Sequence, residues 1–274
     1  MSNDPPVLTA VDAARERVAA EQDRTTAKRE AVDEFRERVR EIDPEPLGGG
    51  GNGALGGGRT NTVATGGTQS RAGSVGGGCR AVRRAFADCL GDMAGDADDS
   101  PDTVHEAIAA EFSEEVAVAL ATADGGGRLT PTLQSGVLDE TRRRRAELSV
   151  MTSALEREAG SLAAAAELLG ETTEWLDEHN PTPLSALSFD DLAARHRRLA
   201  DHRDRLDRAA AARQSFLREA TGEAARVGIR HADLVAYLHE TADTGHPVLA
   251  TLARLGELCE TAQQTVRTHL VCRA

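Results

Sequence analysis

Three glycines, Gly51, Gly53 and Gly56, form the pattern G-x-G-x-x-G, which binds the pyrophosphate of a dinucleotide in many enzymes. That chemistry requires a strand before the glycines and a helix after them, so that the phosphate meets backbone N–H groups at the start of the helix. Here prolines precede the pattern, more glycine follows it, and the chain has no G-K-[ST] sequence. We therefore expect neither a nucleotide site nor any other cofactor.

Four cysteines, Cys79, Cys89, Cys259 and Cys272, could bind a metal ion or form disulfides. None of them forms a C-x-x-C pair, and on one straight helix Cys79 and Cys89 would be separated by a rise of about 15 Å, too far to share a metal ion or a disulfide. His269 and Cys272 share a helix face, but Cys259 points away from them. We expect reduced thiols that pack as small hydrophobic side chains, and no metal site.

Four consecutive arginines at positions 142–145 could contact phosphate groups of a nucleic acid. The alternative is a solvated helix surface whose charge is neutralised by the neighbouring Asp139, Glu140 and Glu147. The net charge of -13 and the low aromatic content, 3%, leave little attraction for phosphate and few rings for stacking bases. Nucleic-acid binding is therefore the less favoured interpretation.

The eight histidines are scattered, and no pair of them has the spacing of metal ligands. His196 falls on the apolar side of an expected helix, which indicates a packed, hydrogen-bonded side chain. No nucleophile, base and acid occur at a spacing that would bring them together. The sequence predicts no catalytic residue, and we expect a protein that is not an enzyme.

The charged residues indicate where the protein works. Asp and Glu total 45 against 32 Lys plus Arg, and Lys28 is the only lysine. An excess of carboxylates keeps a protein hydrated in very salty cytoplasm, where the Debye length shrinks to about 3 Å near 1 M salt. We expect a halophilic, cytoplasmic protein. Residues 1–6 have no basic region or following apolar stretch, and the most apolar windows are shorter than the roughly 18–20 residues of a membrane span.

Residues 8–42 predict one long helix, because apolar side chains recur at alternating steps of three and four. These positions are Val11, Ala14, Val18, Val32, Phe35, Val39 and Ile42. The positions between the two apolar groups hold Glu21, Thr25 and Lys28, so the contact surface has a polar middle and requires a partner helix, from the same chain or another.

The expected domains are an N-terminal heptad helix over residues 1–43, a flexible, disordered Gly-rich linker over 44–78, and a helical domain over 79–274. Further helices are expected over residues 79–94, 102–123, 131–178, 188–222, 231–241 and 247–272. The fold class is therefore all-α, with a long antiparallel coiled-coil hairpin over about 131–222 and C-terminal helices over about 231–272.

Charge supports the hairpin. Residues 151–178 are acidic and residues 195–213 are basic, and Asn180, Pro181 and Pro183 mark a turn between them. Folding back at this turn places the two stretches side by side, with each exposed pair contributing about 0.3–0.5 kcal/mol. Ser188 and Asp191 form an acidic capping box at the start of the return helix.

The C-terminal part reads Tyr237-Leu238-His239, then H-P-V-L-A-T-L-A-R-L over 246–255, and ends His269-Leu270-Val271. With the middle of the chain, residues 80–162, it resembles an uncharacterised family of haloarchaeal helical proteins, a domain of unknown function. The resemblance covers about residues 8–272, with the linker as a variable insert. It implies a haloarchaeal origin and no assigned activity, and it carries over no catalytic residue.

The sequence thus predicts a non-enzymatic helical interaction or scaffold protein that acts through coiled-coil contacts with a protein partner or with itself. The first helix, tethered by the linker, is the expected partner-binding element, docking in cis or in trans. The alternative is a nucleic-acid-associated regulator that uses the arginines at 142–145 and the basic return helix. A protein with an unrecognised metal or ligand site is the third hypothesis.

Overall fold

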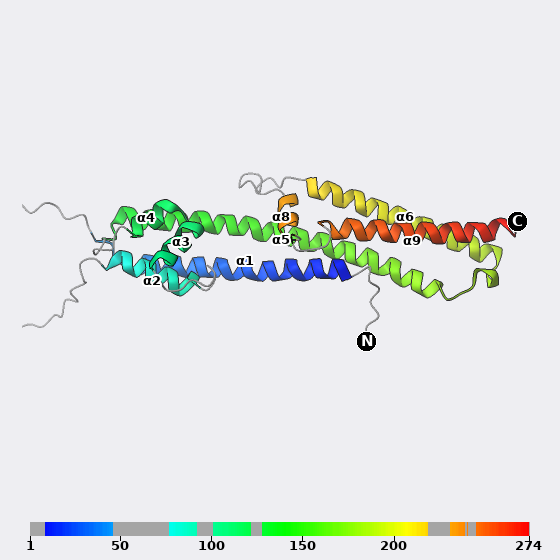
Figure 1. The fold of residues 1–274 in the computed structure, drawn as a ribbon, viewed down its shortest axis with the longest axis horizontal. Coiled ribbons are helices and arrows are strands. Elements are labelled where there is room, and N and C mark those ends of the chain that lie inside the picture. Colours follow the sequence, from blue (N-terminus) through cyan, green and yellow to red (C-terminus); the bar gives the residue numbers. More distant parts are fainter. Residues whose placement is uncertain are drawn as a thin grey trace, which may run out of the picture. The chain divides into compact units, whose positions relative to one another are not determined.

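A computed structural model describes residues 9–45, 77–91, 101–121, 128–218, 231–238, 240 and 245–273. These residues form helices and contain no strand, which confirms the all-α class (Figure 1). Most of the expected linker, including the G-x-G-x-x-G pattern, lies outside the described residues. The helices are α1 (Thr9–Glu41), α2 (Gly78–Leu90), α3 (Pro101–Glu111), α4 (Glu114–Ala121), α5 (Pro131–His179), the 3-10 helix η2 (Leu184–Ala186), α6 (Phe189–Arg218), α8 (His231–Leu238) and α9 (Pro247–Val271).

The chain divides into two compact units. Residues 1–26 and 149–274 make up the first unit, and residues 27–148 make up the second. The long helices α1 and α5 each contribute to both units. The physical reason is that the apolar face of α1 packs into two separate cores, one before and one after this boundary.

In the first unit, α5, α6 and α9 are antiparallel neighbours. Arg213 near the end of α6 binds Glu158 on α5, whereas Arg205, earlier on α6, binds Glu171, later on α5. Helix α9 runs alongside α6 (Figure 1) and continues the alternation, because Gln263 contacts Arg203 and the following Arg273 reaches back to Leu187. Both ion pairs join the acidic stretch of residues 151–178 to the basic stretch of residues 195–213, which were predicted to lie side by side.

Leucines at seven-residue spacing fill the core of the first unit, as a heptad pattern requires. Each is at most 1% exposed: Leu155, Leu162 and Leu169 on α5, and Leu192, Leu199 and Leu206 on α6. Val11, Ala14 and Val18 of α1 belong to the same core and are equally buried. The sequence left open whether the first helix docks in cis or in trans, and the structure buries its apolar face in cis.

The second unit has an aromatic core. Phe35 of α1, Phe86 of α2 and Phe112, just after α3, lie with their ring centroids 5.4–5.9 Å apart. At the end of α1, the side-chain amide of Gln134 on α5 donates hydrogen bonds of 2.9 and 2.7 Å to the carbonyls of Val39 and Ile42. These bonds supply donors to carbonyl groups at the end of α1, where a helix has few N–H groups of its own to pair with them.

Two helix starts are fixed by the caps that their sequences contain. At α6, the hydroxyl of Ser188 accepts the backbone N–H of Asp191 at 3.1 Å and donates to its carboxylate at 2.6 Å, which confirms the predicted capping box. At α5, Thr130 accepts the N–H of Leu133 at 3.1 Å, with Pro131 at the first helical position. None of the described helices combines the length and hydrophobicity that a membrane span needs.

Candidate functional site

The cysteines are all free thiols. Cys79 and Cys259 are buried, Cys89 is half-buried and Cys272 is exposed. Burial raises the pKa of the Cys259 thiol to about 11, so this thiol stays protonated and unreactive at neutral pH. Within the part of the chain that the structure describes, no three His, Cys, Asp or Glu side chains gather closely enough to hold a metal ion.

Each of the four arginines at 142–145 has a carboxylate partner. Three of these partners lie on α5 itself: Asp139, Glu140 and Glu147. The other two partners lie on other helices. Arg144 also binds Glu111 of α3 at 2.7 Å, and Arg145 binds Asp33 of α1 at 3.0 Å. The sequence could identify the first group from helical spacing but could not identify the partners on other helices. The pairing favours a neutralised helix surface over a phosphate-binding one.

A buried ion pair joins α5 to α6. Arg213 is 6% exposed and donates hydrogen bonds of 2.8 and 2.6 Å to the carboxylate of Glu158, which is fully buried. Arg213 also donates to the hydroxyl of Ser161 at 2.9 Å, and its guanidinium lies 5.3 Å from the centre of the Phe216 ring. These partners replace the water that both charges lose on burial.

A second buried polar group lies three to four helical turns closer to the loop that joins α5 to α6. The ring Nδ1 of His202 on α6 is 3.2 Å from the hydroxyl of Thr172 on α5, and the ring lies against Trp175, with centroids 5.1 Å apart. Sequence reasoning singled out His196 instead, which is half-buried. The spacing of His202, three residues after the core residue Leu199, is the signal that could have identified it.

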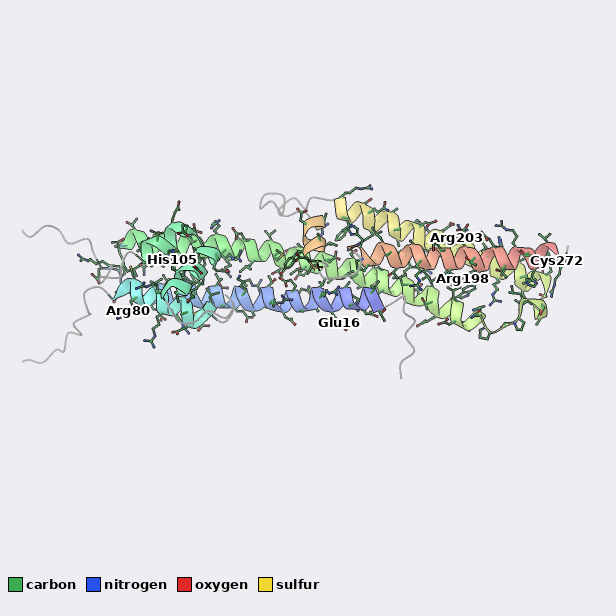
Figure 2. All side chains as sticks on the ribbon, in the orientation of Figure 1. Glu16, Arg80, His105, Arg198, Arg203 and Cys272 are labelled. Carbon is green, nitrogen blue, oxygen red and sulfur yellow. The ribbon has the colours of Figure 1, made fainter. Side chains whose placement is uncertain are left out.

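The solvent-facing side of α9 carries a stripe of uncharged side chains. Exposed side chains recur at steps of three and four and share the absence of charge: Leu258, Thr261, Thr265, Thr268 and Cys272. Leu258 is a large hydrophobic side chain that is 48% exposed. Figure 2 shows Cys272 at the C-terminal end of this helix. We call this set the α9 stripe.

The hydroxyl groups of the three threonines in the α9 stripe are hydrogen-bonded to backbone carbonyls of α9 itself. Thr261 donates to the carbonyl of Glu257 at 2.9 Å, Thr265 to that of Thr261 at 2.9 Å, and Thr268 to that of Gln264 at 3.1 Å. A hydroxyl that is bonded within its own helix needs no water or partner as an acceptor. The stripe therefore offers methyl groups and the Leu258 side chain, and a contact here costs little polar desolvation.

The opposite face of α9 holds the stripe in a fixed position. Leu252, Leu255, Cys259 and Val266 are buried in the core of the first unit. Between them, the buried Gln263 accepts a hydrogen bond of 2.9 Å from Arg203 and donates one of 3.3 Å to the carbonyl of His196. The helix is thus tied to α6 by both packing and directional bonds, and its outer face is preorganised.

A family model for a domain of unknown function, DUF7260, matches residues 9–263. The chain belongs to this family. The DUF7260 match confirms the expected resemblance to a family without an assigned activity, while the haloarchaeal origin stays a prediction. The matched DUF7260 region includes the buried pair of Glu158 and Arg213 and the first two residues of the α9 stripe. No curated protein and no solved structure matches the chain.

Proposed function

We propose that this protein is a non-enzymatic helical interaction protein, that it acts through helix–helix contacts, and that a second copy of the chain binds the α9 stripe. The observation that carries the proposal is the stripe itself: five uncharged, exposed side chains at helical spacing with internally satisfied hydroxyl groups. Such a surface matches the requirement of a helix–helix contact, which excludes water from between small and apolar side chains.

Charge favours a second copy as the occupant. Each copy carries a formal net charge of -13, so most surfaces of two copies repel one another. An uncharged stripe is where this repulsion is smallest. An antiparallel contact with its twofold axis near Gln263 would place Leu258 against Thr268 of the second copy, and Thr261 against Thr265. Such an isologous contact closes after two copies and gives a dimer.

The environment proposed with this function is the cytoplasm of a halophile. The support is the composition, 45 Asp plus Glu against 32 Lys plus Arg with a single lysine. In molar salt, charge repulsion between copies is screened, whereas contacts between apolar groups are strengthened or unaffected. The proposed dimer therefore forms best in the medium for which the composition is suited.

The test is the oligomeric state in about 2 M KCl, where the Debye length is below about 3 Å, measured by sedimentation equilibrium over a range of concentrations. The wild-type chain should dimerise, and Thr261→Glu and Thr268→Glu should be monomeric, because each places two carboxylates in the twofold contact. Ala253→Glu is the matched control, since Ala253 is exposed on α9 outside the stripe. A wild-type monomer at all concentrations, or dimers of both threonine variants as strong as the wild type, would overturn the proposal.

A further inference from the structure

Two adjoining cavities lie in the first unit, beside the turn that joins α5 to α6. Their volumes are about 410 and 330 Å³. Both are lined by the same four residues, Trp175, His179, Thr182 and Arg195, so they share a wall. The His179 ring stacks on the Trp175 indole with a centroid distance of 4.4 Å and an angle of 23°, which makes the centre of this wall a rigid aromatic pair.

The larger cavity is mainly apolar. Apart from the shared wall, its lining includes Leu176, Leu184, Leu199, Leu255 and Val266. Its volume lies within the range of about 300–1,000 Å³ that is typical of small-molecule sites. Thr173 adds a polar group to the lining: its side chain is 9% exposed, and its buried hydroxyl has no hydrogen-bond partner. An unsatisfied buried hydroxyl is a cost that a bound polar atom would remove.

Arg195 is the charged group of the shared wall, and none of the carboxylates that the structure describes forms an ion pair with it. Its side chain is half-buried, and burial lowers the pKa of its guanidinium. Two carboxylates also line the cavities, but neither compensates Arg195. Asp191 is bonded to Ser188, which lowers the pKa of that carboxyl, and the exposed Asp177 makes no ion pair with Arg195.

Two other arginines of the chain show how a buried or half-buried guanidinium is compensated by carboxylates. The more deeply buried Arg213 is paired with Glu158, and the half-buried Arg144 is paired with Glu111 and Glu147. A desolvated guanidinium without an acceptor is unfavourable, and a bidentate carboxylate is the partner that its planar fork fits best. Arg198, exposed at the edge of the smaller cavity, adds a second positive charge there.

We infer that these cavities form a binding site for a small organic monocarboxylate with an apolar chain or ring. Arg195 holds the carboxylate, and the apolar part lies in the larger cavity against Trp175 and the leucines. Charge matching favours a monoanion, because Arg195 is the half-buried cation of the site, whereas Arg198 is exposed and keeps its contact with water. Two residues of the α9 stripe, Leu258 and Thr265, also line the larger cavity. The residues that the dimer test replaces, Thr261 and Thr268, line neither cavity, so the two proposals are tested separately.

The chain provides its own reporter for the test. Trp175 is the only tryptophan, so intrinsic tryptophan fluorescence arises from the shared wall alone. We would titrate the wild-type chain in molar KCl with octanoate, with octanol as the uncharged analogue, and with acetate as the head group without a tail. Octanoate should change the fluorescence saturably, with one site per chain. Octanol lacks the charged hydrogen bond and acetate lacks the apolar burial, so each should bind at least about tenfold more weakly.

Arg195→Gln should weaken octanoate binding about tenfold or more and leave octanol binding unchanged. The matched control is Arg197→Gln, which removes the same charge from an exposed position of α6 that lines neither cavity. If Arg195→Gln does not fold, as circular dichroism would show, Arg195→Lys keeps the charge and removes the bidentate fork. The absence of saturable octanoate binding to the wild type, or equal binding of octanoate and octanol, would overturn the inference.

Discussion

Arg213 on α6 and Glu158 on α5 form a buried ion pair whose two hydrogen bonds measure 2.8 and 2.6 Å. Neither group has bulk water as an alternative partner, because Glu158 is fully buried and Arg213 is 6% exposed. The pair therefore has opposite consequences for two kinds of substitution. Removing one partner leaves a buried charge without compensation, whereas removing both leaves an apolar contact.

Replacing Arg213 alone by Met should lower the free energy of unfolding by about 3–5 kcal/mol, because Glu158 remains buried and unpaired. The double variant Glu158→Leu/Arg213→Met should regain most of that loss. Arg205→Met is the control, because its pair with Glu171 is largely exposed and should cost about 1 kcal/mol or less. Urea unfolding measures all three. A cost for Arg213→Met no larger than that of Arg205→Met would show that the buried pair contributes no more to stability than the exposed one.

Gly78 at the start of α2 approaches Leu129 too closely for a side chain. A Cβ atom at Gly78 would lie 2.6 Å from the Cβ of Leu129. We expect Gly78→Ala to lower the unfolding free energy by about 1–3 kcal/mol, since α2 or the segment before α5 must shift. Gly136→Ala, within α5, has open space around the new methyl group and should stabilise the protein by about 0.5–1 kcal/mol. Thermal unfolding of both variants gives the comparison, and equal effects of the two would exclude steric crowding at Gly78.

The sequence predicted the helical faces well because helical periodicity is a local property. Val11, Val18 and Val32, which were predicted to share one face of the first helix, are all buried. Glu158 and Thr172 are buried on α5. Their partners could not be predicted. Arg213 and His202 lie 55 and 30 residues away, and the pairing depends on the antiparallel register that the whole hairpin adopts.

The two units and the cavities have the same physical explanation. Periodicity shows which face of α1 is buried but not which neighbour covers it. The first part of α1 packs into one core and the later part into the other, and no pattern in the sequence marks the point where this changes. Arg195 resembles the other arginines of residues 195–213 in the sequence. Its lack of a counter-ion becomes visible only when α5, α6 and α9 enclose it.

His202 should make stability depend on pH. Burial lowers the pKa of its imidazole, and the charges of Arg198 and Arg205 lower it further against the opposing effects of Asp201 and Glu171. Between this lowered pKa and the ordinary value near 6.5, the unfolded chain binds a proton that the folded chain does not. The contribution is therefore fully present above about pH 6.5 and is lost as the pH falls, by at most about 1.4 kcal/mol per pH unit.

Urea unfolding at pH 7.5 and 5.5 measures this dependence. The double variant Thr172→Val/His202→Leu removes the ionisable group together with its hydrogen-bond partner, so its stability should change less over this interval than that of the wild type. His246→Gln, at an exposed position, should retain the wild-type dependence. If the double variant and the wild type lose the same stability on acidification, another group is responsible.

Salt should stabilise the fold although it weakens individual ion pairs. Exposed pairs such as Arg40–Glu37 and Arg142–Asp139 contribute about 0–1 kcal/mol each, and screening removes part of that. The larger electrostatic effect is repulsion, because a net charge of -13 remains after every cation is paired. Raising the ionic strength from about 0.1 to 1 M shortens the Debye length from about 10 to 3 Å and suppresses this repulsion.

Helicity and the unfolding temperature should therefore rise together with KCl concentration, as followed by circular dichroism at 222 nm. Sucrose at matched osmolality is the control, since it favours compact states without screening charge. Full helicity and an unchanged unfolding temperature at about 0.05 M KCl, where the Debye length exceeds about 10 Å, would contradict the halophilic interpretation. The Glu158–Arg213 pair should be the contact least affected by salt, because mobile ions do not reach a buried pair, so the cost of Arg213→Met should be similar at both ends of the titration.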